Sequence, residues 1–233
     1  MLIAENLTCR RGGRVVLESL ELRVAAHEIV ALVGPAEAGK TTAFECFLGL
    51  HQPAAGRASI DDLDTVACRD AVSSLVALVP AQPSLPMAAP ILTYVRNTCI
   101  RLGRRIPEAF LGAALERGGI PRAWHQTRMG DCPPSLQRKL AVTLAGLKNV
   151  SSLLIDDPTR DIEDEDLDSM IAALRALRKR GRAILLATRD LAFAHRVATR
   201  VVVLDQGCTV ESYDPNTSRH SHHAGSYLAD LVG

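Results

Sequence analysis

The pattern G-x-x-x-x-G-K-[ST] is matched in full by Gly34-Pro35-Ala36-Glu37-Ala38-Gly39-Lys40-Thr41. Two glycines at this spacing let the backbone wrap closely around an anion, and the positive end of a following helix points at the same place. Lys40 would then reach the β- and γ-phosphates of a nucleotide, and Thr41 would ligate Mg²⁺. The competing interpretation is a tight turn that ends in a solvated lysine.

The residues around this stretch favour the phosphate-binding interpretation. Ile29–Val33 is a continuous, partly β-branched apolar run, which predicts a strand buried on both faces. Apolar residues recur at helical spacing across Lys40–Leu50, which predicts a helix that Gly49 ends. The alternation in Leu20–Val24 predicts a half-exposed strand before them.

The same alternation of strand and helix returns near the end of the chain. Strands are predicted at Ser152–Ile155, Ala183–Ala187 and Val201–Leu204, with a helix at Leu191–Val197. Another helix lies between the first two strands, is capped by Gly181, and has one apolar face made of Leu167, Met170, Ile171, Leu174 and Leu177. This order predicts a parallel α/β sheet.

Asp156 follows the first of these strands. A carboxylate at the tip of a strand beside the loop can hold magnesium through water. An aspartate in this place is usually only a turn residue, so the prediction depends on its pairing with residues 34–41.

A different composition separates the two halves. Pro80, Pro83, Pro86 and Pro90 interrupt regular structure, and helices are then predicted at 91–104, 107–117 and 135–149. We therefore expect a mostly helical insertion over about 85–145.

Charge and composition exclude several classes of protein. The 27 basic and 26 acidic residues leave a net charge of +1, too little to grip nucleic acid. Apolar runs are the length of strands, short of the roughly 20 residues of a membrane span. Six cysteines without a C-x-x-C pair, and no secretory leader, predict reduced thiols in the cytosol. His220, His222 and His223 indicate either a metal site or, as we expect, a solvated terminus.

The chain resembles the nucleotide-binding domains of ATP-binding cassette (ABC) transporters over nearly its whole length. The resemblance rests on residues 34–41 and on Ala4–Thr8, Glu28–Pro35, Pro53, Gly56, Asp156-x-Pro158-Thr159 and Val203–Gly207. It implies a P-loop NTPase fold: a RecA-like α/β core with an antiparallel β subdomain (1–84 and 146–233) and a helical subdomain (85–145). It also implies ATP and Mg²⁺ as cofactors.

The resemblance assigns site residues one by one. It implies catalytic roles for Asp157 and Arg189, and Mg²⁺ ligation by Thr41 and Asp156. The implied cofactor-binding residues are Arg11, Gly34, Pro35, Ala36, Glu37, Ala38, Gly39, Lys40, Thr41, Thr42, Gln82 and Asp156.

Several of these residues depart from the family pattern. Arg11 replaces an aromatic residue that stacks on adenine, and Gln82 comes one residue after the expected glutamine position at Ala81. Asp157 replaces a catalytic glutamate and shortens its reach by one methylene. Arg189 replaces a histidine and cannot relay a proton near neutral pH.

The signature loop departs most. Cys132-Pro133-Pro134-Ser135-Leu136 aligns with Leu-Ser-Gly-Gly-Gln, and the two prolines lack the N–H groups that would bind phosphate across a dimer. Asp131 adds a negative charge, which would repel phosphate. Ser135 either caps the following helix or, shifted by one position, replaces the signature serine. The D-loop is also changed, to Arg160-Asp161-Ile162-Glu163.

The leading hypothesis is a cytoplasmic ATP-binding subunit of an ABC transporter, peripheral on the inner face of the membrane. Its partners would be transmembrane permease subunits and a second ATP-binding subunit, in a homodimer or heterodimer, with no nucleic acid. Hydrolysis by this ABC-type ATPase would be slow or absent. The alternatives are a nucleotide-sensing or structural module, a small-molecule kinase, and a loop retained only for folding.

Overall fold

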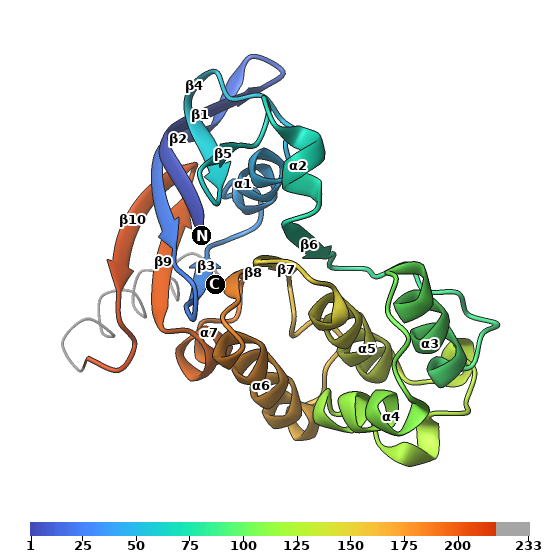
Figure 1. The fold of residues 1–233 in the computed structure, drawn as a ribbon. Helices are drawn as coiled ribbons and strands as arrows, with labels where there is room; N and C mark the ends of the chain where they lie inside the picture. The colour runs from blue at the N-terminus through green and yellow to red at the C-terminus, as the bar shows by residue number, and fades with distance from the viewer. Residues whose placement is uncertain (218–233) are drawn as a thin grey trace.

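A six-stranded sheet lies at the centre of the computed structural model, which describes residues 1–217 (Figure 1). The strand order is β10-β9-β3-β8-β7-β6, parallel except at β10, which pairs with β9 in the antiparallel sense. The strands are β3 (Ile29–Val33), β6 (Val76–Val79), β7 (Ser152–Asp156), β8 (Ala183–Thr188), β9 (Arg200–Asp205) and β10 (Cys208–Tyr213). His220, His222 and His223, for which we predicted a solvated terminus, lie outside the described residues.

The central strands have the environment that their sequences predict. Every residue of β3 and β8 is buried, because helices or the second sheet cover both faces. Helix α1 (Lys40–Phe47) follows the glycine loop but is shorter than the predicted Lys40–Leu50. It ends because Gly49 adopts a left-handed φ of 64°, in a place where a Cβ would lie 2.2 Å from the Thr65 carbonyl oxygen.

A second, antiparallel sheet packs over α1, as the family resemblance implied (Figure 1). Its order is β2-β1-β4-β5, formed by β1 (Leu2–Arg11), β2 (Arg14–Val24), β4 (Ala55–Ile60) and β5 (Leu63–Asp64). Periodicity alone predicted only the end of β2. The short helix α2 (Arg69–Ser73) leads from this sheet to β6.

Two helices cover the opposite face of the six-stranded sheet. Helix α6 (Asp164–Lys179) buries Met170, Ile171, Leu174 and Leu177 there, as predicted. Helix α7 (Leu191–Val197) has the predicted bounds. Within residues 1–217, no helix is both long enough and apolar enough to span a membrane.

The remaining helices form an arm with its own hydrophobic cluster (Figure 1). They are α3 (Ile91–Arg101), α4 (Glu108–Arg117), η1 (Arg122–Trp124), η2 (Met129–Asp131) and α5 (Pro134–Leu147). Helix α3 stops before the predicted residue 104 because Gly103 takes a left-handed φ of 72°. Ser135 lies inside α5, whose N-cap is Pro133, so the first of the two alternatives for Ser135, that it caps this helix, was wrong.

Candidate phosphate-binding site

The loop between β3 and α1 adopts a conformation that two of its glycines make accessible. A Cβ at Gly34 would lie 2.0 Å from the Leu204 carbonyl oxygen, so the backbone of β9 leaves no room for a side chain. Gly39 is the N-cap of α1 and has a φ of 103°, where a Cβ would meet the Val16 carbonyl oxygen at 2.6 Å. Packing therefore requires glycine at both positions.

A cavity of about 810 Å³ opens beside this loop, where β3, β7 and β8 end. This volume is within the range of small-molecule sites. Eleven of the predicted site residues line it, namely Arg11, Ala36, Glu37, Ala38, Gly39, Lys40, Thr41, Thr42, Asp156, Asp157 and Arg189. Gly34, Pro35 and Gln82 do not line it, and Ala81 does. Sequence reasoning missed Arg14, Val15, Val16, Ala187, Thr188 and Gln206.

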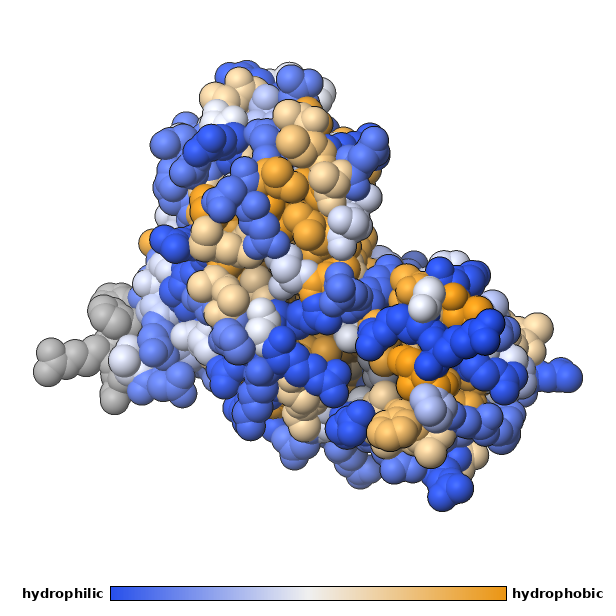
Figure 2. Space-filling view, in the orientation of Figure 1, coloured by the Kyte–Doolittle hydropathy of each residue, from blue (hydrophilic) through white to orange (hydrophobic). Residues whose placement is uncertain are grey.

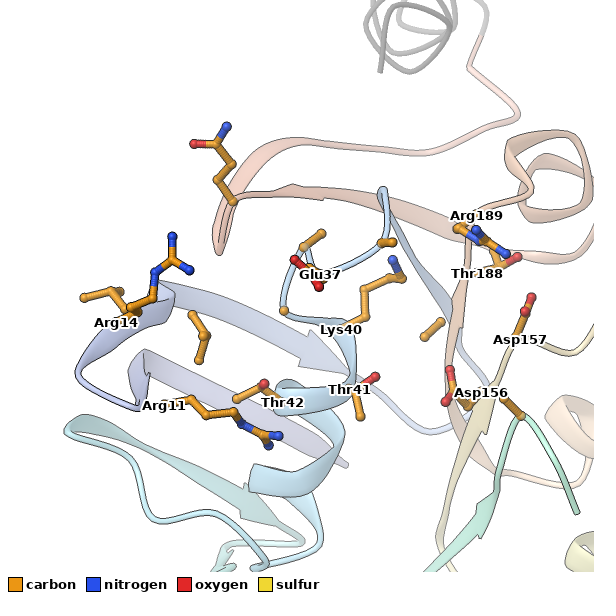
Figure 3. A pocket seen from close by; sticks show the side chains of 18 residues that line it. Arg11, Arg14, Glu37, Lys40, Thr41, Thr42, Asp156, Asp157, Thr188 and Arg189 are labelled. Atoms are coloured by element: carbon orange, nitrogen blue, oxygen red, sulfur yellow. The ribbon is translucent and has the colours of Figure 1, made fainter. Parts of the chain in front are cut away.

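Lys40 is held inside the loop that it follows (Figure 3). Its ammonium group donates to the carbonyl oxygens of Gly34 and Pro35, each at 2.6 Å. Burial lowers the pKa of Lys40, the positive charge of Arg189 lowers it further, and Asp156 and Asp157 oppose both effects. The cation is thus placed at the edge of the cavity with carbonyl partners that a phosphate can replace.

Two carboxylates face this lysine from the end of β7 (Figure 3). Burial raises the pKa of Asp156, and the neighbouring charge of Asp157 adds to that effect. Asp157 has a left-handed φ of 46° and is fixed by a hydrogen bond from its N–H to the Ala187 carbonyl oxygen at 2.8 Å. Among residues 1–217, neither carboxylate makes an ion pair within 4.0 Å.

This donor set fits a hard divalent cation. The Thr41 hydroxyl and the Asp156 carboxylate line the same cavity, and both are oxygen ligands of the kind that Mg²⁺ prefers. A bound cation would also relieve the repulsion that raises the pKa of Asp156. Groups of three or more His, Cys, Asp or Glu side chains that could hold a metal ion are absent from the described part of the chain.

The far rim of the cavity is formed by the β1–β2 hairpin (Figure 3). Arg11 lies there and forms an ion pair with Glu45 of α1. Arg14 faces the same cavity after the Gly12-Gly13 turn. The turn glycines were the signal that could have identified Arg14, because a hairpin brings both of its flanking residues to one edge.

Comparison with known proteins decides the family. A model of the ABC transporter family matches residues 17–160. The chain is also 31% identical over 225 residues to the zinc import ATP-binding protein ZnuC of Magnetococcus marinus, covering 96% of this chain and 81% of that protein. The chain belongs to the ABC transporter family, as an ATP-binding subunit.

Other similarities agree with this membership. The L-cystine transport system ATP-binding protein TcyN of Escherichia coli is 26% identical over 221 residues, covering 89% of this chain and 87% of that protein. A solved ATP-binding subunit of an ABC transporter superposes with a TM-score of 0.82 at 20% identity, over 100% of both chains. A dimeric bacterial ABC transporter cassette, MJ0796, gives 0.80 at 20% identity, over 93% of this chain and 100% of that one. At 20% identity, the likeness to these two structures supports the fold of this chain and nothing further.

The arm of this ABC subunit contacts the core through an arginine that sequence reasoning missed. Arg138 of α5 donates to the carbonyl oxygens of Pro80, at 3.0 Å, and Ala81. Its side chain is 3% exposed and lies 3.9 Å from an Asp161 carboxylate oxygen. Arg138 thereby joins the signature helix to the segments before Gln82 and after Asp157.

The segment 132–136, where α5 begins, contains two prolines and a buried serine. Pro133 and Pro134 supply no N–H group at the start of α5. Ser135 is buried, and the pKa of the Asp166 carboxyl is lowered mainly by Lys139 and to a lesser extent by Ser135. The strongest cause of that lowering is the hydrogen bond from Lys139 at 2.5 Å.

Proposed function

We propose that this subunit binds Mg-ATP in the cavity between residues 34–41 and Asp156, and that binding couples its dimerisation to separate membrane subunits. The observation that carries the proposal is the convergence of Lys40, Thr41 and Asp156 on one cavity. Backbone N–H groups, the helix N-terminus and Lys40 would hold the phosphates. Mg²⁺, held by Thr41 and Asp156, would neutralise phosphate charge when bound.

We further propose that hydrolysis is slow or absent. Asp157 is the candidate general base, and its carboxylate reaches less far than that of a glutamate. Arg189 lines the cavity and can neutralise phosphate charge, but it has no proton to exchange near neutral pH. A subunit that presents Pro133 and Pro134 to its partner's nucleotide offers no backbone donors there.

The proposed partners are transmembrane permease subunits and a second ABC ATP-binding subunit, identical or different. The dimeric form of the related cassette MJ0796 supports pairing. The arm has apolar surface among hydrophilic residues (Figure 2), including Met87, Ile100 and Leu102, which are 50%, 53% and 41% exposed. This region, residues 82–104, extends from just before a helical subdomain at 85–145 into its first part. It would contact the permease and keep the subunit at the cytoplasmic face of the membrane.

A second candidate function is a nucleotide-sensing module that dimerises on ATP without turnover. Asp157 and Arg189, which both differ from the family pattern, are at positions expected to act during hydrolysis. Lys40 and Thr41, which act in binding, are in place.

Two measurements test these proposals. Calorimetry should show Mg-ATP binding to the wild type and a loss of at least about tenfold in affinity for Lys40→Ala, the size of effect expected for a charge-assisted contact. No binding by the wild type would refute the leading proposal. Purification of the native complex should yield a membrane protein, whereas a soluble complex without one would favour the sensing module.

A further inference from the structure

Cys9 and Cys46 form a buried pair beside the nucleotide cavity. Their sulfur atoms lie 3.3 Å apart, and both residues are 0% exposed. Cys9 belongs to β1 and Cys46 to α1, so the contact joins the antiparallel sheet to the helix that follows the phosphate loop. Both cysteines are free thiols. Neither has a role in the proposed binding of nucleotide.

We propose that Cys9 and Cys46 are a modification site, which a peroxide closes into a disulfide that weakens nucleotide binding. In the first step the Cys9 thiol loses its proton and the thiolate attacks hydrogen peroxide. The O–O bond breaks, Cys9 becomes a sulfenic acid, and the departing hydroxide takes up the proton to form water. Cys46 then attacks that sulfur, the S–O bond breaks, and the S–S bond forms. The hydrogen bond with Cys9 and burial raise the pKa of Cys46, so this thiol gives up its proton only as it attacks, and the departing hydroxyl takes up that proton to leave as a second water. The two thiols lose two protons and two electrons in total, and these reduce one peroxide to two waters.

The local structure favours Cys9 as the first thiol to react. The hydrogen bond with Cys46 lowers the pKa of Cys9, and burial opposes this effect. A thiolate is the reactive form. The pairing of β1 with β2 shifts register on both sides of Cys9, between Leu7 and Cys9 and between Cys9 and Arg10. Because an interrupted ladder opens at lower cost than a regular one, a small oxidant can reach the thiol there.

The bond would act on the site through α1. Cys46 lies on the same eight-residue helix as Lys40 and Thr41. On the exposed side, Glu45 of this helix already forms an ion pair with Arg11 of β1. Closing 3.3 Å to a disulfide length of about 2.05 Å draws the helix and strand together. Since the phosphate loop leads directly into α1, this movement shifts Lys40 relative to Asp156.

The experiment uses the full-length chain treated with a stoichiometric amount of hydrogen peroxide. Non-reducing peptide mass spectrometry should find a Cys9–Cys46 peptide two hydrogens lighter than its reduced parts. The variants Cys9→Ser and Cys46→Ser should lack it. The control Cys99→Ser removes another buried cysteine and should leave it unchanged.

The second arm of the experiment measures Mg-ATP affinity before and after oxidation. We expect about tenfold weaker binding in the oxidised wild type, a typical coupling between sites, with recovery in dithiothreitol and no change in Cys46→Ser. Because coupling is reciprocal, saturating Mg-ATP should also slow formation of the disulfide in the wild type but not in Lys40→Ala.

Only this second arm rests on the proposed function, so the two can fail separately. Thiols that stay reduced, stop at sulfenic acid, or pair with other cysteines would overturn the modification site, whatever the nucleotide result. A Cys9–Cys46 disulfide with unchanged affinity would overturn its effect on the site. Failure of the reduced wild type to bind Mg-ATP would refute both the proposed function and its regulation by the disulfide. The mass spectrometry would still decide whether Cys9 and Cys46 are a modification site.

Discussion

Lys40 donates a hydrogen bond from its ammonium group to the carbonyl oxygen of Gly34 at 2.6 Å, across the loop that ends at its own helix. A second bond to Pro35 has the same length. The lysine therefore holds the loop in shape before any ligand arrives. An incoming phosphate has to replace these two carbonyl oxygens, so its net gain depends on the charge of Lys40.

As pH rises, the affinity for Mg-ATP should be lost at a lower pH than it would be if Lys40 had the pKa of an ordinary lysine. Under the proposed function Lys40 would bind phosphate while protonated, and its pKa is lowered by burial and then by Arg189. Binding is thus strong below the lowered pKa and is lost as pH rises through it. Arg189→Gln removes one of the two causes of the lowered pKa of Lys40. The midpoint of the loss of Mg-ATP binding should then move to higher pH, as measured by calorimetry over the alkaline range. The exposed control Arg105→Gln should leave the midpoint where it was.

Glu37 should weaken nucleotide binding. It lines the cavity with an exposed side chain and has a left-handed φ of 65°, which costs an L-residue about 1 kcal/mol. Glu37→Gln removes only the charge and should tighten Mg-ATP binding severalfold without changing stability. Glu37→Gly should tighten binding and also raise the free energy of unfolding, measured in urea. Glu116→Gln, at an exposed position of α4, is the matched control. Equal affinities for Glu37→Gln and wild type would contradict the repulsion.

The reach of residue 157 should control turnover. A displacement of about 1 Å at a catalytic group can cost on the order of 10²-fold in rate, so Asp157→Glu should raise ATP hydrolysis by up to that factor. Asp157→Asn should abolish residual hydrolysis while keeping Mg-ATP affinity, because asparagine also accepts the φ of 46°. The check is phosphate release under saturating ATP. A higher rate in the asparagine variant would show that Asp157 is not the base.

Arg138 should stabilise the junction between arm and core. Arg138→Ala leaves the Pro80 and Ala81 carbonyl oxygens without their donor and opens a cavity, which should lower the free energy of unfolding by about 2–4 kcal/mol. Arg138→Lys keeps the charge but loses the planar pair of donors. Its free energy of unfolding should therefore lie between those of the wild type and Arg138→Ala. The exposed variant Arg105→Ala should change it by less than about 0.5 kcal/mol. Urea unfolding measures all three.

His195 should make the fold sensitive to mild acid. Burial lowers its pKa from 6.5, and its ring nitrogen hydrogen bonds with the Tyr213 hydroxyl at 2.7 Å. Between 6.5 and the lower folded value, the unfolded chain binds more protons than the folded one, so stability falls as pH falls through this window. His195→Gln should flatten the dependence of melting temperature on pH there. His27→Gln, an exposed control, should not.

Local patterns predicted the central strands and α7 because burial and periodicity are properties of neighbouring residues. Ile29–Val33 and Leu191–Val197 have the predicted bounds. Gly49 ends α1 as predicted, although the helix stops at Phe47 and not at Leu50. The predicted end of α3 was wrong, because the left-handed conformation of Gly103 ends that helix at Arg101. Periodicity did not predict β1 and β4. The register of these strands is set by their pairing with each other.

The chemistry of the phosphate loop was contained in the chain itself, since Gly34, Gly39 and Lys40 act within a few residues of one another. The placement of Asp156 opposite Lys40, of Arg138 under Ala81 and of Cys9 against Cys46 came from the packing of distant segments. Strand order and helix docking fix these contacts, and no local propensity encodes them. Sequence thus specified which groups are present for binding, and the folded core specified which of them meet.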